Sequence, residues 1–265
     1  FPGSTLINRI NLQHALNLFE AGDYAASASK FAEVSEAQLE SSQVTQFLFK
    51  KAYSDFALGK YDSALEGFTR VEATPHSVYL APARYALGYI NYDKKNFVEA
   101  EKWFRFSQKD SRFKEISQYY LVECRFMQED YQYVVSNAPK MMASCPQDRK
   151  QRLARIISES YLVLGDTKAA HEYYQSVSTE APKTRSDFFY AGSLLYAIGD
   201  FKGAIENYTN MKDRSDSLGQ IANYHLGYSY IKTKNKVAAM GAFKDASLVD
   251  FDEKIAEDAY FNYAK

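Results

Sequence analysis

The chain has 265 residues, a net charge of −1 and acidic and basic residues interspersed along its whole length. This balance argues against an electrostatic surface for nucleic acid or for an anionic membrane. No apolar stretch approaches the roughly 18 residues that a membrane span needs, so we expect no nucleic-acid partner and no membrane insertion within this chain.

One local pattern recurs along the chain. A turn is followed by an aromatic residue, then by a small residue three positions later and a large apolar residue four positions after that, first as Gly22-Asp23-Tyr24 with Ser27 and Phe31. The later copies start at Gly59, Lys95, Glu129, Gly165, Gly199 and Lys234, with spacings of 37, 36, 34, 36, 34 and 35 residues. A fixed period of this length predicts stacked helix–turn–helix units, each of which buries its apolar face only against its neighbours.

Apolar periodicity predicts two helices in each unit. In the third unit they lie between Tyr85 and Phe106, with Gly88 and Ala100 small where the two helices approach. The other expected helices, in chain order, are Ile7 to Phe19, Tyr24 to Leu39, Val44 to Leu58, Arg112 to Met127, Tyr131 to Met142, Gln147 to Leu164, Asp187 to Ile198, Phe201 to Met211, Leu218 to Thr233 and Lys236 to Leu248.

The fourth unit departs from the pattern. It has Ala138-Pro139 where its second helix should carry a large apolar residue. Proline removes a backbone donor, so we expect this helix to be short or kinked, with an irregularity near 136–150 and a loop at 143–146.

The recurring pattern resembles the tetratricopeptide repeat (TPR), and the resemblance covers roughly residues 10 to 250. It implies an all-α fold, a right-handed α-solenoid of about seven TPR-like repeats plus a terminal helix. We expect a single superhelical domain over 6–265 and, from the abrupt ends of the chain, a fragment of a longer protein. The expected repeats are 6–40, 43–76, 80–110, 113–146, 148–182, 185–215 and 218–250, with 252–265 as the first helix of an eighth repeat or a cap.

The sequence contains no recognisable catalytic, cofactor or metal motif. The four histidines lie in different repeats, and His225, which precedes a Leu-Gly pair, is expected to be structural. We therefore predict no enzymatic activity and no cofactor. Cys124 and Cys145 are expected to be free thiols, because their predicted offset of about 9 Å along the helix axis is too long for a disulfide.

The TPR resemblance places a concave groove along the first helix of every repeat. The groove positions are mostly aromatic and are Phe49, Tyr53, Phe56, Tyr85, Tyr89, Tyr92, Tyr119, Phe126, Arg152, Arg155, Phe189, Tyr196, Tyr224 and Tyr228. Two interpretations stay open. The rings either form a wide core whose hydroxyls reach the rim, or line a trough for an extended segment or helix of a partner.

These features predict a non-enzymatic scaffold that binds another protein or peptide of unknown identity. The alternatives are a carbohydrate-binding TPR-like module of an outer-membrane glycan-capture system and the sensor part of a regulatory protein. A chaperone carboxylate clamp is disfavoured, because Leu12, Leu16, Phe49 and Tyr53 occupy its Lys and Asn positions. The aromatic, Gly-Asp-Tyr-rich texture is similar to long cell-envelope TPR proteins of Bacteroidetes, which favours the periplasm or cell envelope over the cytoplasm.

Overall fold

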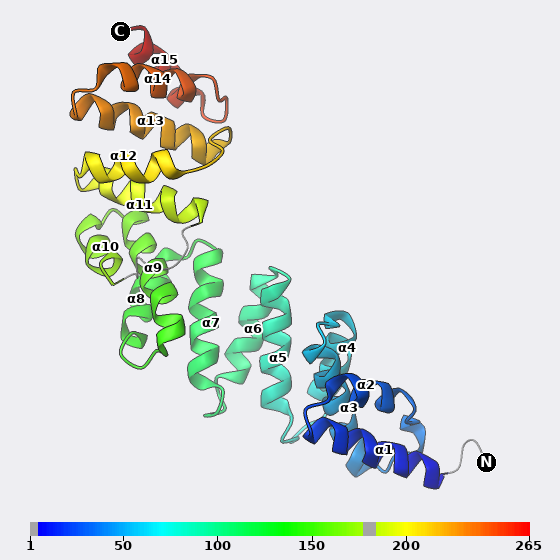
Figure 1. Ribbon diagram of the computed structural model, residues 1–265. Helices are drawn as coiled ribbons and strands as arrows, with labels where there is room; N and C mark the ends of the chain where they lie inside the picture. Colours follow the sequence, from blue (N-terminus) through cyan, green and yellow to red (C-terminus); the bar gives the residue numbers. More distant parts are fainter. Residues whose placement is uncertain (1–4, 177–183) are drawn as a thin grey trace. The chain divides into compact units, whose positions relative to one another are not determined.

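The computed structural model describes residues 5–176 and 184–265, and all the regular structure in these ranges is helical (Figure 1). The prediction of an all-α fold of helix pairs is therefore confirmed. The α-helices are α1 (Thr5–Glu20), α2 (Tyr24–Ala32), α3 (Ser41–Ala57), α4 (Tyr61–Glu72), α5 (Leu80–Asp93), α6 (Phe97–Ser107), α7 (Lys114–Met127), α8 (Tyr131–Asn137), α9 (Gln147–Val163), α10 (Thr167–Tyr174), α11 (Arg185–Ala197), α12 (Phe201–Asn210), α13 (Ser217–Lys232), α14 (Lys236–Ser247) and α15 (Glu253–Ala264).

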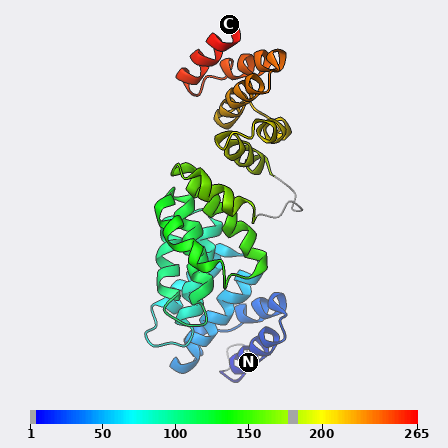
Figure 2. The same cartoon turned by 90° about the vertical axis from the view of Figure 1, so that its left-hand side faces the viewer.

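The chain divides into two compact units, Phe1–Asp130 and Tyr131–Lys265. Within the first unit α1 pairs with α2, α3 with α4 and α5 with α6, and α7 follows α6. Within the second unit α8 packs on α9, and the pairs are α9 with α10, α11 with α12 and α13 with α14, followed by α15. Figures 1 and 2 show the members of each pair side by side and joined by a tight turn.

The turn inside each pair has a left-handed backbone. All seven predicted turn positions have positive φ: 79° at Gly22, 73° at Gly59, 60° at Lys95, 61° at Glu129, 86° at Gly165, 84° at Gly199 and 65° at Lys234. A left-handed residue just after a helix reverses the chain and satisfies the last carbonyls, and glycine adopts this conformation without steric cost. The pattern that repeats along the sequence therefore marks the points at which the backbone reverses direction between two helices.

The residue after the turn begins the second helix. The Asp23 carboxylate accepts a hydrogen bond from the backbone N–H of Ala26, at 3.0 Å. Asp166, Asp200 and Asn235 make the equivalent bond in their own repeats. Such side chains satisfy one of the free N–H groups at a helix start. The Gly-Asp dipeptide thus ends one helix and starts the next.

In every pair except α9–α10 a large buried side chain of the second helix packs against the first helix. Phe31, Phe68, Phe104 and Tyr208 are fully buried, and Phe243 is 2% exposed. Three of these rings lie against a glycine of the first helix. A Cβ at Gly88 would lie 2.8 Å from Phe104, one at Gly192 would lie 2.8 Å from Tyr208, and one at Gly227 would lie 2.6 Å from Phe243. In these three pairs the ring of the second helix therefore packs directly on the backbone of the first helix, and the two helices cannot approach more closely.

One predicted helix boundary is wrong. The second helix was expected to run to Leu39, but α2 ends at Ala32, and only a 3₁₀ turn, Glu36–Gln38, follows. The buried Asn8 side chain donates to the carbonyl of Ser35 at 3.0 Å and accepts from its N–H at 2.7 Å. This distant side chain takes both backbone groups that a longer helix would have paired internally.

The irregular fourth repeat is confirmed. α8 ends at Asn137, a 3₁₀ turn covers Ala138–Met141, and 143–146 is not helical. Cys124 is a buried free thiol and Cys145 a half-buried one. The predicted end of the fifth repeat, at 182, lies outside the described residues. No helix in the described ranges is long and apolar enough to span a membrane.

We predict that Gly88→Ala destabilises the protein by about 1–3 kcal/mol, because the added methyl collides with the buried Phe104 ring. The matched control is Gly241→Ala in α14, whose Cβ would meet nothing within 4 Å. There alanine should stabilise the helix by up to about 1 kcal/mol. Urea denaturation monitored by circular dichroism measures both, and equal stability of the two variants would show that the close approach is not limiting.

Candidate functional site

The predicted groove residues all lie on the first helices of the repeats. We call the set in each unit the first-helix row of that unit, so the chain has two such rows. In the first unit they are Phe49, Tyr53 and Phe56 on α3, Tyr85, Tyr89 and Tyr92 on α5, and Tyr119 and Phe126 on α7. In the second unit they are Arg152 and Arg155 on α9, Phe189 and Tyr196 on α11, and Tyr224 and Tyr228 on α13. Phe49 and Tyr119 are buried, Arg152 is exposed, and all the others are half-buried.

The rings of the first unit form a continuous series from α3 to α7. Phe56 contacts Tyr89 with ring centroids 5.6 Å apart, and Tyr89 contacts Tyr120 at 5.8 Å. Tyr120 also lies 5.1 Å from Tyr92 and stacks on Phe104 at 5.0 Å. The sequence register selected Tyr119 and missed Tyr120. The adjacent position joins the series because it faces α5 and α6.

A buried carboxylate fixes two hydroxyls of this row. Glu123 on α7 is 2% exposed and accepts hydrogen bonds from the hydroxyls of Tyr92 and Tyr119. Tyr92 belongs to the preceding repeat, so this bond joins one first helix to the next. Charge-assisted hydrogen bonds of this kind are stronger than neutral ones, and they hold the rings in one orientation.

The second unit repeats this arrangement at its C-terminal end. The Asp258 carboxylate on α15 accepts from Tyr224 Oη at 2.7 Å, from Tyr228 Oη at 3.0 Å and from Asn262 Nδ2 at 2.9 Å. Burial, together with the bond to Asp258, raises the pKa of Tyr224 above its ordinary value, so its hydroxyl remains a donor. Both tyrosines thereby connect α13 to α15.

His225 lies beside these residues and has a structural role, as the sequence predicted. Its ring stacks on Tyr196 with centroids 4.3 Å apart, and its Nδ1 lies 2.9 Å from Tyr208 Oη. Burial lowers the pKa of His225 to about 4, so the ring is neutral at physiological pH. The neutral His225 ring, fixed by Tyr196 and Tyr208, therefore contributes to the packing of the second unit.

The first-helix row of the second unit is charged on α9. Arg155 Nη1 pairs with Asp187 of α11 at 2.5 Å, while Arg155 Nε lies 3.9 Å from Glu159 Oε2. These last two atoms are buried, and neither has a hydrogen-bond partner among the described residues. Burial raises the pKa of Glu159, because an arginine at this distance does not compensate for lost hydration.

These groups do not form a reactive constellation. Among the described residues no cluster of His, Cys, Asp and Glu could hold a metal ion. Burial raises the pKa of the Cys124 thiol to about 12, so it remains protonated. A protonated buried thiol is a poor nucleophile.

The geometry defines the class of protein as an α-solenoid built from helix pairs. The sequence model of the tetratricopeptide repeat family matches residues 12–78 and 49–107. Residues 12–107 therefore match tetratricopeptide repeats in sequence, and the helix pairs of the second unit have the same helix–turn–helix form. No curated protein matches the sequence at a significant level.

Solved structures share this fold at low sequence identity. A tetratricopeptide repeat protein from Parabacteroides merdae has a TM-score of 0.56 and 11% identity, over 97% of this chain and 99% of that one. The C-terminal part of a TPR repeat-containing protein from Cytophaga hutchinsonii has a TM-score of 0.60 and 15% identity, over 94% and 98%. The apo form of the quorum sensor NprR from B. thuringiensis has a TM-score of 0.54 and 12% identity, over 96% and 79%. The first two organisms are Bacteroidetes, in agreement with the texture of the sequence.

We predict that Asp258→Ala loosens α15. Removing the carboxylate leaves the hydroxyls of Tyr224 and Tyr228 without their acceptor, at a cost of about 1–3 kcal/mol. Hydrogen exchange should accelerate in α15 and remain unchanged in α9–α12. Glu257→Ala, an exposed change on the same helix, is the control, and equal exchange in the two variants would contradict the role of Asp258.

We also predict that Glu159→Gln stabilises the protein at neutral pH. The folded pKa of Glu159 is raised, so folding disfavours the ionised form, and the wild type loses stability as the pH rises through that pKa. Glutamine does not titrate. The gain in the free energy of unfolding should therefore be present at pH 7 and vanish below the ordinary pKa of 4.5. Urea titrations across this pH range measure it, and the exposed Glu172→Gln should show no such pH-dependent gain.

Proposed function

We propose that the protein is a non-enzymatic scaffold whose first-helix rows bind a peptide or helix of another protein. The tetratricopeptide repeats support this proposal, because stacked repeats present extended surfaces suited to binding. The observation that best supports the proposal is how the rings of the two rows are exposed and held. Most of these rings are half-buried, and the carboxylates of Glu123 and Asp258 hold several of them in place.

Half-burial distinguishes these rings from an ordinary core. The large side chains that close the pairs, such as Phe104 and Tyr208, are fully buried, whereas Tyr89, Tyr196 and Tyr228 keep part of their surface accessible. A ring that is already fixed loses little conformational entropy when a partner covers it. Rigid aromatic side chains of this kind supply most of the energy at many protein interfaces.

The charged segment on α9 adds polarity to the row of the second unit. Arg152 is exposed, and Arg155 and Glu159 each keep a buried atom without a hydrogen-bond partner among the described residues. Arg155 Nε and Glu159 Oε2 are closed to solvent, so the group of this segment that a peptide reaches is the guanidinium of the exposed Arg152. We propose that this segment orients the bound peptide.

Site-specific crosslinking tests this function. A photo-reactive phenylalanine in place of Arg152, in the first-helix row, should capture a partner from cells of the source organism. The same residue in place of Lys168, exposed on the second helix α10 of the same repeat, should not capture it. Capture from Lys168 alone would contradict the proposal.

The captured partner then allows a binding measurement. Arg152→Glu and Tyr196→Ala, both in the row of the second unit, should each weaken its binding by about tenfold, as expected for contacts at an interface. Lys168→Glu and Thr69→Ala, exposed changes on second helices, should leave it unchanged. Circular dichroism confirms that each variant is folded before binding is measured.

A further inference from the structure

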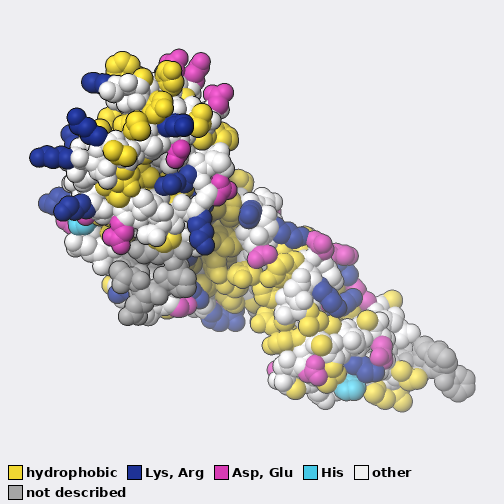
Figure 3. All heavy atoms as spheres, turned by 45° about the horizontal axis from the view of Figure 1, so that its top comes forward, with side chains coloured by type: hydrophobic (Ala, Val, Ile, Leu, Met, Phe, Trp, Pro, Cys, Tyr) yellow, Lys and Arg dark blue, Asp and Glu magenta, His cyan; other side chains and the backbone are white. Residues whose placement is uncertain are grey.

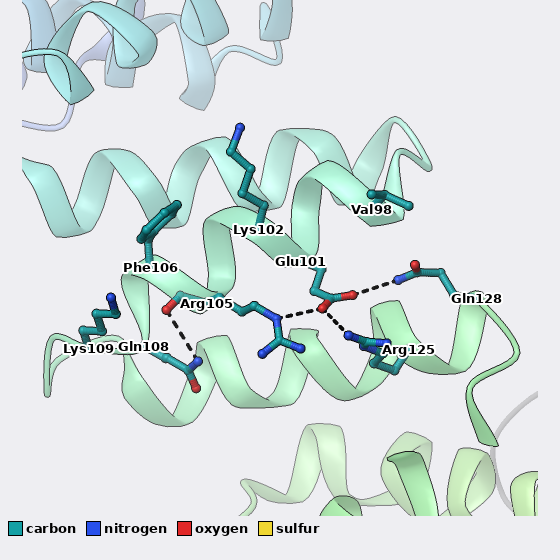
Figure 4. Close-up of a pocket in the computed structure, with 9 residues that line it drawn as sticks. All are labelled: Val98, Glu101, Lys102, Arg105, Phe106, Gln108, Lys109, Arg125 and Gln128. Carbon is teal, nitrogen blue, oxygen red and sulfur yellow. Dashed lines mark hydrogen bonds and ion pairs between the residues drawn. The ribbon is translucent and has the colours of Figure 1, made fainter. Parts of the chain in front are cut away.

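A trough lies between α6 and α7 in the first unit, apart from the first-helix row. Its volume is about 680 Å³ (Figure 4). Most of its lining comes from α6 and the residues directly after it, while α7 contributes one side chain and the residue directly after α7 contributes another. The lining residues are Val98, Glu101, Lys102, Arg105, Phe106, Gln108, Lys109, Arg125 and Gln128.

A carboxylate at the centre organises the trough. Glu101 is 9% exposed and accepts hydrogen bonds from Arg105 Nε at 2.7 Å, Arg125 Nη2 at 2.6 Å and Gln128 Nε2 at 3.2 Å. Figure 4 shows its carboxylate between these three side chains. Burial alone would raise the pKa of Glu101, but these hydrogen bonds outweigh it and lower the pKa. Glu101 therefore stays ionised and fixes both guanidinium groups.

The lining has a clear excess of positive charge. It holds four cationic side chains, Lys102, Arg105, Lys109 and Arg125, against the single carboxylate of Glu101. Arg125 also pairs with Asp130 at 2.9 Å, and counting that carboxylate leaves two positive charges. Lys102 also pairs with Glu99 at 2.7 Å, but this pair is exposed and exposed pairs contribute little. Lys109 forms no ion pair with any described residue. The excess is local, because the whole chain has a net charge of −1.

Apolar surface accompanies these charges. Phe106 is 36% exposed and Val98 is 70% exposed. Two cations lie over the Phe106 ring, with the Arg84 guanidinium 5.1 Å and the Lys109 ammonium 5.4 Å from its centroid. Val98 and Phe106 are eight positions apart on one helix, about 12 Å along its axis. An extended peptide covers this length with about four residues.

We propose that the trough between α6 and α7 is a docking site for an acidic peptide segment of another protein, independent of the first-helix rows. Aspartate or glutamate side chains of the segment pair with Lys102, Arg105 and Lys109, and one apolar side chain covers Phe106. Fixed guanidinium groups bind carboxylates through two parallel hydrogen bonds, which favours an acidic peptide. A small inorganic anion would leave the surfaces of Phe106 and Val98 uncovered.

Peptide binding to the whole chain tests this inference. The probe is a fluorescein-labelled peptide in which aspartates and glutamates flank one phenylalanine. The control peptides carry either asparagine and glutamine in place of the acids or alanine in place of the phenylalanine. Fluorescence anisotropy should show saturable binding of the acidic probe that weakens with added salt. Both control peptides should bind more weakly, and chemical-shift changes should map to α6 and α7.

Charge reversal supplies the matched variants. Lys102→Glu/Lys109→Glu should weaken binding of the acidic probe by about tenfold or more, because two attractive contacts become repulsive. Neither lysine bonds to Glu101, so the central cluster remains intact. Lys168→Glu/Lys202→Glu makes the same change of charge on exposed positions of the second unit and should leave binding unaffected.

The contrary results are equally specific. The inference fails if no saturable binding occurs at millimolar probe, or if the amide-containing peptide binds as well as the acidic one. It also fails if both double variants bind alike, or if the shifts map to the first-helix row of α3 and α5.

Discussion

The close approach of the two helices in a pair is the constraint on which the structure depends. At Gly88, Gly192 and Gly227 a buried ring of the second helix lies directly against the backbone of the first. A ring in that position leaves one distance and one orientation available to the pair, because larger residues collide and smaller ones leave a cavity. The tight turn follows from this geometry, since only a left-handed residue reverses the chain within so short a connection.

A second set of contacts joins successive first helices within each unit. Glu123 accepts from a tyrosine of α5, Asp258 from tyrosines of α13, and Asp187 pairs with Arg155 of α9. Each is a carboxylate of one repeat bonded to a side chain of the repeat before it. The pair geometry sets where the first helices lie, and these bonds set how their side chains point. The positions of the first helices and the orientations of their side chains are thus fixed in the unbound protein, so little ordering is needed when a partner binds.

The sequence was sufficient for features that depend on neighbouring residues along the chain. The seven turn positions were predicted correctly, because a left-handed turn and a following cap leave a signature over a few residues. The end of α2 was predicted wrongly, because the side chain of Asn8, 27 positions away, forms hydrogen bonds with the backbone of Ser35. The hydroxyl acceptors Glu123 and Asp258 escaped prediction for the same reason. The trough was also missed, although Glu101 and Arg105 share one face of α6, because Arg125 and Gln128 complete it from the next repeat.

The shortness of α8 affects how the second unit can open. This helix has seven residues and buries only Val134, and the 3₁₀ turn after it adds Ala138. In an array whose elements contact only their sequence neighbours, an element separates at the cost of its own contacts alone. Because α8 buries so little apolar surface, its packing on α9 is lost at a lower cost than the packing of helices that carry a fully buried ring.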